Sequence, residues 1–462
     1  MKRNKLIFSV LFSTTFVLIF TSCYTGKKMS KSMSEHVFAF GTPPGPPPNG
    51  MPPGGEMGQK FDVNTIQATL SVKEGAETKS NETITADNTN QSAVATFGNA
   101  VLMLDRNSIS TTGRSTSSDN SSFQGLNAIV LGRDRSKINM SGNKLTSSGA
   151  GANAVFAYGK SVISSDRDVI NCTGAYAHGL MASGGGTILA SNINVHTEGA
   201  NSGAVATDRG SGTITVNGGK ISTTGVDSPD IYSTGKITVS DAELTTTGAE
   251  MAVIEGSNSI VLKRSNMSSA TPNKWGVMIY QSFSGDAEGV DGNFRMEDGA
   301  LAYNDTKGPL FFVTNSVANI HLKRVDVTAG SGILLKATSS RWGHKGSNGG
   351  KANLSVESQT LNGSLMADSL STISLSLLNS SVFSGSINAD RRAQKASLNL
   401  DGTSSWTLTA DSYVTALNID ISGDAVMNVI GNGHTVYYKL SENRRLEGKT
   451  YKLKQGGFLK PE

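Results

Sequence analysis

The sequence predicts an all-β protein, a single-stranded right-handed parallel β-helix of about twelve three-strand coils with a C-terminal β cap. Three observations predict it: a short phrase that recurs along the chain, a spacing that stays nearly constant, and a composition with few charges and few aromatic residues. The stretch GTITVNGGKISTTG (212–225) is followed closely by GKITVSDAELTTTG (235–248). The spacing of the phrase carries the structural information, because its apolar positions recur at fixed places.

Each phrase contains two short strands. Ile214 and Val216 alternate with polar residues, and Ile221 and Thr223 do the same, so each pair lies on one face of an extended strand. The residues 217–219 (NGG) between them favour a turn, and Gly225 closes the unit where a positive φ is expected. A third strand precedes each phrase, as in NAVFAYG (153–159) and GVMIYQ (276–281).

The first apolar position of the phrase recurs along most of the chain. Steps of 25, 25, 26 and 23 residues separate Ile138, Ile163, Ile188, Ile214 and Ile237, a period typical of solenoids. The full series is Leu102, Ile138, Ile163, Ile188, Ile214, Ile237, Ile260, Phe294, Ile320, Leu354, Leu375 and Leu398. Three larger steps, of 36, 34 and 34 residues, indicate loop insertions. A β-sandwich of hairpins, the alternative fold, does not predict such a register.

Four further columns follow from the same alignment, and inward residues should stack on their equivalents about 4.8 Å away. They are an aliphatic stack (Ile129, Val155, Leu180, Val205, Ile231, Val253), a second stack (Leu104, Met140, Ala190, Val216, Val239), a small polar ladder (Thr111, Ser147, Cys172, Thr197, Thr223, Thr246) and a glycine column (Gly113, Gly149, Gly174, Gly199, Gly225, Gly248).

Composition limits the possible functions. The net charge of +4 is small and the basic residues are scattered, so the sequence does not indicate nucleic-acid binding. Cys172 sits in the polar ladder and has no nearby base, which favours a buried thiol over a catalytic one.

The N-terminus predicts export. A basic start (MKRNK) precedes the apolar stretch LIFSVLFSTTFVLIF and then TSC at 21–23. The segment LIFTSC resembles the lipobox of bacterial lipoproteins, which implies cleavage before Cys23 and lipidation of Cys23. The expected location is the outer membrane, with the protein at the cell surface or on the periplasmic face. The alternative is a plain signal peptide cleaved near Ser22.

Four segments are expected. Residues 1–23 form the lipoprotein signal, 24–60 a Pro/Gly-rich linker that extends away from the lipid, 61–403 the β-helix, and 404–462 a closing segment. In the last segment, Trp406, Thr407 and Ser412 match a Trp-Thr-x-x-x-x-Ser pattern, so it resembles the end of pertactin-like autotransporter passengers. The membrane barrel of that family is not expected within the remaining residues, and the last strands are expected to cover the open end of the solenoid.

Catalysis is the alternative function. The β-helix resembles the pectate-lyase-like superfamily, which includes polysaccharide lyases and glycoside hydrolases. The Asn-Thr-Asp, Asp-Asp, Gly-His-Gly and Arg-x-Lys motifs of polygalacturonases do not occur in usable form, and WGHKG (342–346) lies in an insertion. No catalytic residue and no metal-binding histidine spacing is therefore predicted.

Two insertions are the candidate binding site. SGDAEGVDG (284–292) and SSRWGHKGSNGGKA (339–352) follow the same strand of two coils, so their bases should lie about 10 Å apart. An exposed Trp beside charged groups favours sugar stacking or protein contact. The site residues are Arg341, Trp342, His344, Lys345, Asp286, Glu288 and Asp291. Two alternatives stay open: the loops pair with each other, or the acidic trio holds Ca²⁺.

The sequence thus predicts a lipid-anchored, adhesin-like or structural binding rod of the cell envelope, without catalysis. Its partners would be the membrane, through the lipid, and a glycan or protein surface. The oligomeric state is not specified.

Overall fold

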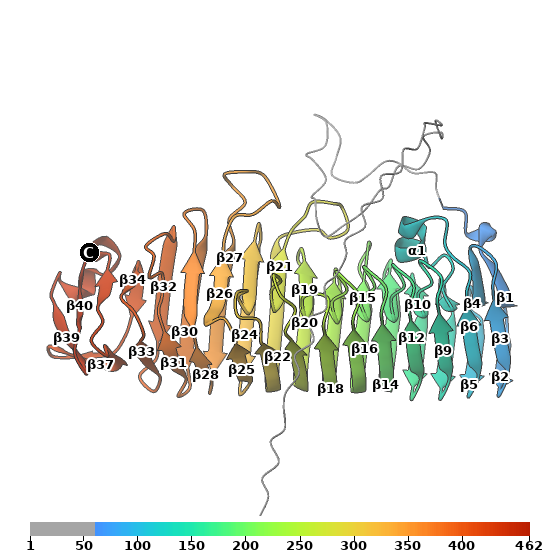
Figure 1. Ribbon diagram of the computed structural model, residues 1–462, viewed down its shortest axis with the longest axis horizontal. Coiled ribbons are helices and arrows are strands. Elements are labelled where there is room, and N and C mark those ends of the chain that lie inside the picture. The colour runs from blue at the N-terminus through green and yellow to red at the C-terminus, as the bar shows by residue number, and fades with distance from the viewer. Residues whose placement is uncertain (1–60) are drawn as a thin grey trace, which may run out of the picture. The chain divides into compact units, whose positions relative to one another are not determined.

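The computed structural model describes residues 61–462 (Figure 1). The predictions for the signal peptide, for lipidation at Cys23 and for the linker 24–60 lie outside these residues. Among the described residues, no helix has both the length and the apolar character needed to cross a membrane.

The described residues form a parallel β-solenoid with three sheets, which confirms the predicted fold class. The first sheet, here called sheet A, takes one strand from each of twelve successive coils, and neighbours pair in parallel. Its strands are β1 (Gln67–Val72), β4 (Gln91–Thr96), β7 (Val130–Gly132), β10 (Val155–Tyr158), β13 (Leu180–Ser183), β15 (Val205–Thr207), β17 (Ile231–Ser233), β19 (Ala252–Glu255), β21 (Val277–Tyr280), β23 (Phe311–Thr314), β26 (Ile333–Ala337) and β29 (Ser364–Ala367).

The second sheet, sheet B, contains both strands of the repeated phrase. Its strands are β2 (Ala76–Ser80), β3 (Thr83–Ala86), β5 (Val101–Asp105), β6 (Ser108–Thr111), β8 (Lys137–Ser141), β9 (Lys144–Ser147), β11 (Val162–Asp166), β12 (Val169–Cys172), β14 (Thr187–Thr197), β16 (Thr213–Thr223), β18 (Lys236–Thr246), β20 (Ser259–Ser269), β22 (Asp291–Tyr303), β24 (Val317–Lys323), β25 (Asp326–Ala329), β27 (Lys351–Glu357), β30 (Thr372–Leu378), β32 (Lys395–Leu400) and β35 (Ala416–Asn418).

The third sheet, sheet C, lies at the C-terminal end of the described chain. Its strands are β28 (Thr360–Asn362), β31 (Val382–Gly385), β33 (Ser405–Leu408), β34 (Ser412–Val414), β36 (Ile421–Ser422), β37 (Ala425–Ile430), β38 (Val436–Tyr438), β39 (Tyr451–Lys454) and β40 (Phe458–Pro461). The helices are α1 (Ser118–Gln124) and the short 3-10 helices η1 (Val63–Thr65), η2 (Leu440–Glu442) and η3 (Arg444–Leu446).

The predicted turn inside the repeated phrase is a bend within one continuous strand. β16 runs from Thr213 to Thr223, and Gly218 at its centre has φ 80°. A residue with left-handed backbone occupies the same place in successive coils. The equivalence is shown by the residue just before it, which pairs in register with its counterpart in the next coil. We call this series the corner column; it comprises Asn81, Arg106, Gly142, Arg167, Asn192, Gly218, Asp241, Arg264, Asp298, Arg324, Ser358 and Asn379.

Two of the predicted inward columns, the first apolar series and the polar ladder, are confirmed in full. The second stack is confirmed except that Ser165 lies between Met140 and Ala190. Every member of the first apolar series pairs with the next, from Leu102 to Leu398, and the series continues to Leu417. These side chains are buried, and each contributes about 1.5–3 kcal/mol of burial free energy. The polar ladder is also in register, with Cys172 between Ser147 and Thr197. Burial raises the pKa of the Cys172 thiol to about 11, which makes it a poor nucleophile.

The aliphatic stack was wrong at its two ends. Val155, Leu180, Val205 and Ile231 pair as predicted, but Val155 pairs with Val130 rather than Ile129, and Ile231 pairs with Ala252 rather than Val253. Each end is displaced by one residue. Ile129 precedes β7 and stays in the main core, whereas Val253 packs in the cluster on the other face of the sheet. Val253 therefore belongs to the outer face of sheet A.

The glycine column is confirmed, but its physical reason is different. Gly174, Gly199, Gly225 and their equivalents do not have positive φ. A Cβ atom at Gly199 would lie 1.9 Å from the carbonyl oxygen of Gly174, and the same contact recurs from coil to coil. Close approach of successive backbones, and not a left-handed turn, requires glycine here.

The solenoid has about 16 turns, more than the twelve predicted. The apolar template missed the first described coil, where Glu77 and Lys79 occupy the positions stacked on Leu102 and Leu104. These two side chains form an ion pair of 3.2 Å. The count of twelve also left out residues 404–462, which were expected to form a passenger-like β segment and a cap.

Parallel pairing continues beyond residue 403. Trp406 is fully buried, lies opposite Phe383, and donates from Nε1 to the carbonyl of Gly385 at 2.9 Å. The final strands β39 and β40 pair antiparallel with each other. The coils therefore extend into the segment that resembles autotransporter passengers.

Candidate functional site

The outer face of sheet A carries two apolar clusters, one around Leu131, Phe156 and Met181 and a second between β17 and β26. In this part of the sheet the outward column reads Tyr232, Val253, Met278 and Phe312, which pair in register. Elsewhere on the solenoid surface, the outward columns of β14, β16 and β18 are mainly Thr, Ser and Asn. The apolar and aromatic residues on this face form a second cluster outside the main core, together with Trp342.

Two tryptophans define a cavity of about 440 Å³ on this face. The Trp275 ring stacks in parallel on Phe312, with centroids 4.0 Å apart. Trp342 packs against Tyr280 at 4.9 Å, and the Arg341 guanidinium lies 5.0 Å from the centre of the Trp342 ring. The residues that line the cavity are Glu250, Asn273, Lys274, Trp275, Met278, Ser340, Arg341 and Trp342. We call this cavity the tryptophan pocket.

On one side of the tryptophan pocket, a lysine lies between two carboxylates and pairs with them. The Lys274 ammonium forms a short ion pair with Asp227 and lies 3.7 Å from the Glu250 carboxylate. Burial raises the pKa of Glu250, and Lys274 opposes part of that rise. The pocket therefore combines aromatic faces with an acid, a base, an amide and a hydroxyl, the groups that bind sugar hydroxyls.

The two predicted insertions lie on the same edge of the solenoid (Figure 1). They follow β21 and β26, which are separated by β23, so the predicted spacing of two coils is confirmed. Phe283 in the first loop stacks on His344 in the second, with centroids 6.2 Å apart. The alternative that the loops contact each other is therefore correct for these two rings.

The prediction that Trp342 is exposed was wrong. Trp342 is 5% exposed and packs into the aromatic cluster on sheet A, because the loop folds back over that face. Of its predicted neighbours, Arg341 lines the tryptophan pocket, whereas Lys345 is exposed and lies outside the set of pocket residues.

The acidic trio is not gathered at one point. Asp286 pairs with Arg209 at 2.8 Å, Glu288 is exposed, and Asp291 begins β22, where its backbone N–H donates to the Ser257 hydroxyl. Within residues 61–462, no group of three or more His, Cys, Asp or Glu side chains is arranged to hold a metal ion. The structure thus offers no Ca²⁺ site in this trio.

A buried carboxyl ties the first insertion to sheet A. Glu255 is 1% exposed and accepts hydrogen bonds from the Tyr232 and Tyr280 hydroxyls at 2.6 and 2.7 Å. Its other oxygen accepts a short bond from the Ser282 hydroxyl. Burial raises the pKa of Glu255. Because both oxygens are occupied by protein donors, this carboxyl orders the loop and is poorly placed to activate water.

Sequence reasoning missed most of the tryptophan pocket. Trp275, Lys274 and Glu250 precede strands of two adjacent coils, and none of them interrupts the repeat. One signal was present: Trp275 is one of only three tryptophans in the chain, and another, Trp342, was singled out.

Comparisons with known proteins do not assign a function. No family model matches the chain, and no curated protein matches it. A chain in the cryo-EM structure of the Vag8–C1 inhibitor complex is similar, with a TM-score of 0.39 and 13% identity over 81% of this chain and 91% of that chain. The class defined by the strand pairing of this chain is a parallel β-solenoid with an aromatic pocket on one outer face.

Proposed function

We propose that this protein is a non-catalytic binding module of the cell envelope, and that the tryptophan pocket binds a saccharide unit of a surface glycan. The observation that carries the proposal is the stack of Trp275 on Phe312 beside a concave cavity. One face of Trp275 is covered by Phe312 and the residue lines the cavity, so the C–H groups of a sugar ring would stack on its cavity side.

Polar groups around the cavity would orient a bound sugar through hydrogen bonds. Lys274, Glu250, Asn273 and Ser340 offer donors and acceptors at its rim, and Arg341 adds a positive charge. An acidic sugar would gain from that charge, while a neutral sugar would use the hydroxyl and amide groups. Aromatic and arginine side chains commonly carry most of the binding free energy in such sites.

A glycan array probed with the whole exported protein tests this proposal. Trp275→Ala should weaken binding to the best glycan by about 1–3 kcal/mol, or about 5- to 150-fold. Tyr413→Ala is the matched control, because Tyr413 is a half-buried aromatic residue stacked on Tyr437 at 4.7 Å outside the pocket. Equal loss of binding in both variants, or none in Trp275→Ala, would argue against the pocket.

The enzyme alternative makes a different prediction. Incubation with acidic and neutral polysaccharides should give binding without shorter products. Turnover that disappears in Asp286→Asn would replace the binding proposal with a polysaccharide-cleaving function.

Display at the envelope rests on the sequence resemblance at LIFTSC. Replacing Cys23 with Ser should move the protein from the membrane fraction to the soluble fraction. Retention of this variant in the membrane after a carbonate wash would contradict lipidation. Protease shaving of intact cells would then distinguish cell-surface display from the periplasmic face.

A further inference from the structure

The corner column carries charge where uncharged residues would be easier to accommodate. All its members have φ between 46° and 80°, a region that glycine and asparagine enter most readily. The column uses Gly142, Asn192 and Gly218 at some levels, but arginine or aspartate at Asp241, Arg264, Asp298 and Arg324. Arginine has neither the small size of glycine nor the local hydrogen bonding of asparagine, so its presence in this conformation requires a reason beyond the bend.

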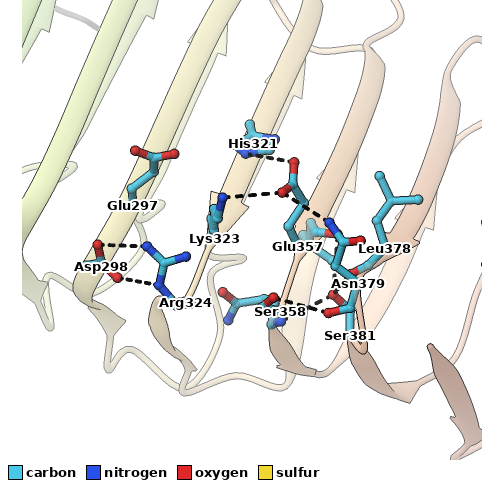
Figure 2. Close-up of polar contacts among 12 residues, drawn as sticks. Glu297, Asp298, His321, Lys323, Arg324, Glu357, Ser358, Leu378, Asn379 and Ser381 are labelled. Carbon is cyan, nitrogen blue, oxygen red and sulfur yellow. Dashed lines mark hydrogen bonds and ion pairs between the residues drawn. The ribbon is translucent and has the colours of Figure 1, made fainter. Parts of the chain in front are cut away.

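These four residues occupy successive coils and alternate in sign. Arg264 donates to both carboxylate oxygens of Asp241 at 2.8 and 2.7 Å, and Arg324 donates to both oxygens of Asp298 at 2.8 and 3.1 Å. Figure 2 shows the Asp298–Arg324 pair at the corner of the solenoid. The arginine hydrogen bonds hold the pKa values of both aspartates below the usual range, so the alternation persists at neutral pH.

The residues just before the corner alternate as well. Lys263, Glu297, Lys323 and Glu357 pair in register on successive coils, and we call them the flanking column. The Lys323 ammonium lies 3.6 Å from the Glu357 carboxylate, as Figure 2 also shows. Two adjacent columns thus form one ridge with charges of alternating sign, spaced about 4.8 Å apart along the solenoid axis.

A ridge of this kind is complementary to itself when one copy is reversed. Reversal places Asp241 opposite Arg324 and Arg264 opposite Asp298, and the same two-fold axis brings Lys263 to Glu297. An in-register parallel copy would instead bring like charges together. We propose that two copies of this chain associate antiparallel along the ridge formed by the corner and flanking columns, as a closed two-fold pair.

The side chains are able to make these contacts without breaking their own pairs. Arg264 and Arg324 use Nε and Nη2 within the chain, and in residues 61–462 their Nη1 groups donate to no protein acceptor. The arginine side chains are 58% and 50% exposed. Because the ridge is only two columns wide and its charges are exposed to solvent, the association should be weak and strongly dependent on salt.

Sedimentation velocity on the whole exported protein tests this inference. At about 20 mM salt the protein should form a reversible dimer, and at about 300 mM salt, where charges are screened within several ångströms, the dimer should dissociate. Arg264→Asp/Arg324→Asp makes the corner entirely acidic, and Asp241→Arg/Asp298→Arg makes it entirely basic. For each double variant alone, the dissociation constant of the dimer should rise by about tenfold or more.

Mixing the two double variants provides the decisive measurement. If the ridge is the interface, the acidic and basic variants should associate with each other at low salt. The matched control is Arg106→Asp/Arg167→Asp, which makes the same charge change in the corner column at levels interrupted by Gly142, and it should dimerise like the original chain. Circular dichroism should show that all three variants fold.

Two results would overturn the proposal. The first is an original chain that stays monomeric at low salt. The second is an acidic or a basic double variant that, on its own, dimerises as tightly as the original chain. Neither result bears on the tryptophan pocket, which lies on sheet A.

Discussion

The coils built from β16, β18 and β20 differ from those that carry the two insertions. In the first group each strand is eleven residues long, and every inward residue stacks on an equivalent from the next coil. In the second group the outer face of sheet A gathers Trp275, Phe312 and Trp342 from non-equivalent positions. Repetition thus builds the scaffold, whereas departures from it build the pocket. The two regions should respond differently to substitution.

The largest expected effect is in the repeated coils. Val216 is fully buried between Ala190 and Val239, so Val216→Asp would place a carboxylate between two apolar layers. The free energy of unfolding should fall by several kcal/mol. Ser222→Asp, on the outward side of the same strand, should change it little. Equal stability of the two variants in urea titrations would contradict the inward register.

Trp342 provides the corresponding test in the coils that carry the insertions. Because it is buried in the aromatic cluster, Trp342→Ala should lower the free energy of unfolding by up to about 3–5 kcal/mol and lower the melting temperature as well. Lys345→Ala, three residues later and exposed, should stay within about 0.5 kcal/mol of the original chain. A normal melt for Trp342→Ala would restore the hypothesis of an exposed tryptophan.

The glycine column is the next test. A methyl group at Gly199 would overlap the Gly174 carbonyl at 1.9 Å and push two coils apart, so Gly199→Ala should cost about 1–3 kcal/mol or more. At Gly402 a methyl group would meet no atom within 4 Å, and Gly402→Ala should be nearly neutral. Calorimetry of both variants separates the effect of close approach from a general effect of glycine.

The smallest effect concerns pH. Asp230 is fully buried, one carboxyl oxygen has no partner among the described residues, and burial raises its pKa well above the usual value. Its contribution to stability is therefore complete below about pH 4 and is lost as pH rises through the raised pKa. Asp230→Asn should remove this loss. The melting temperature of the variant, minus that of the original chain, should therefore increase as pH rises. A difference that does not vary with pH would show that Asp230 is not protonated in the folded state.

The repeated positions were predictable from sequence because each column is constrained by its equivalents above and below. Leu102 to Leu398 and the ladder through Cys172 follow one alignment, and the structure pairs them without exception. The reason for the glycines was not predictable, since backbone approach between coils depends on the shape of the cross-section.

The tryptophan pocket was only partly predictable. The insertions and Trp342 could be identified from irregular spacing, but the burial of Trp342 depends on how its loop folds over Phe312 and Tyr280. Trp275 and Glu250 lie within ordinary coil lengths, so no irregularity marks them. The corner column was not predictable from sequence, because Arg and Asp do not indicate a left-handed backbone as strongly as glycine does.

The charged pair in the first described coil has a consequence for polymerisation. Glu77 and Lys79 stand where later coils place Leu102 and Leu104. A stack of identical apolar layers would accept another chain's strands as readily as its own, and such addition can continue without limit. A layer that stacked directly on Glu77 and Lys79 would have to dehydrate both ions, so these two positions disfavour the addition of an apolar strand.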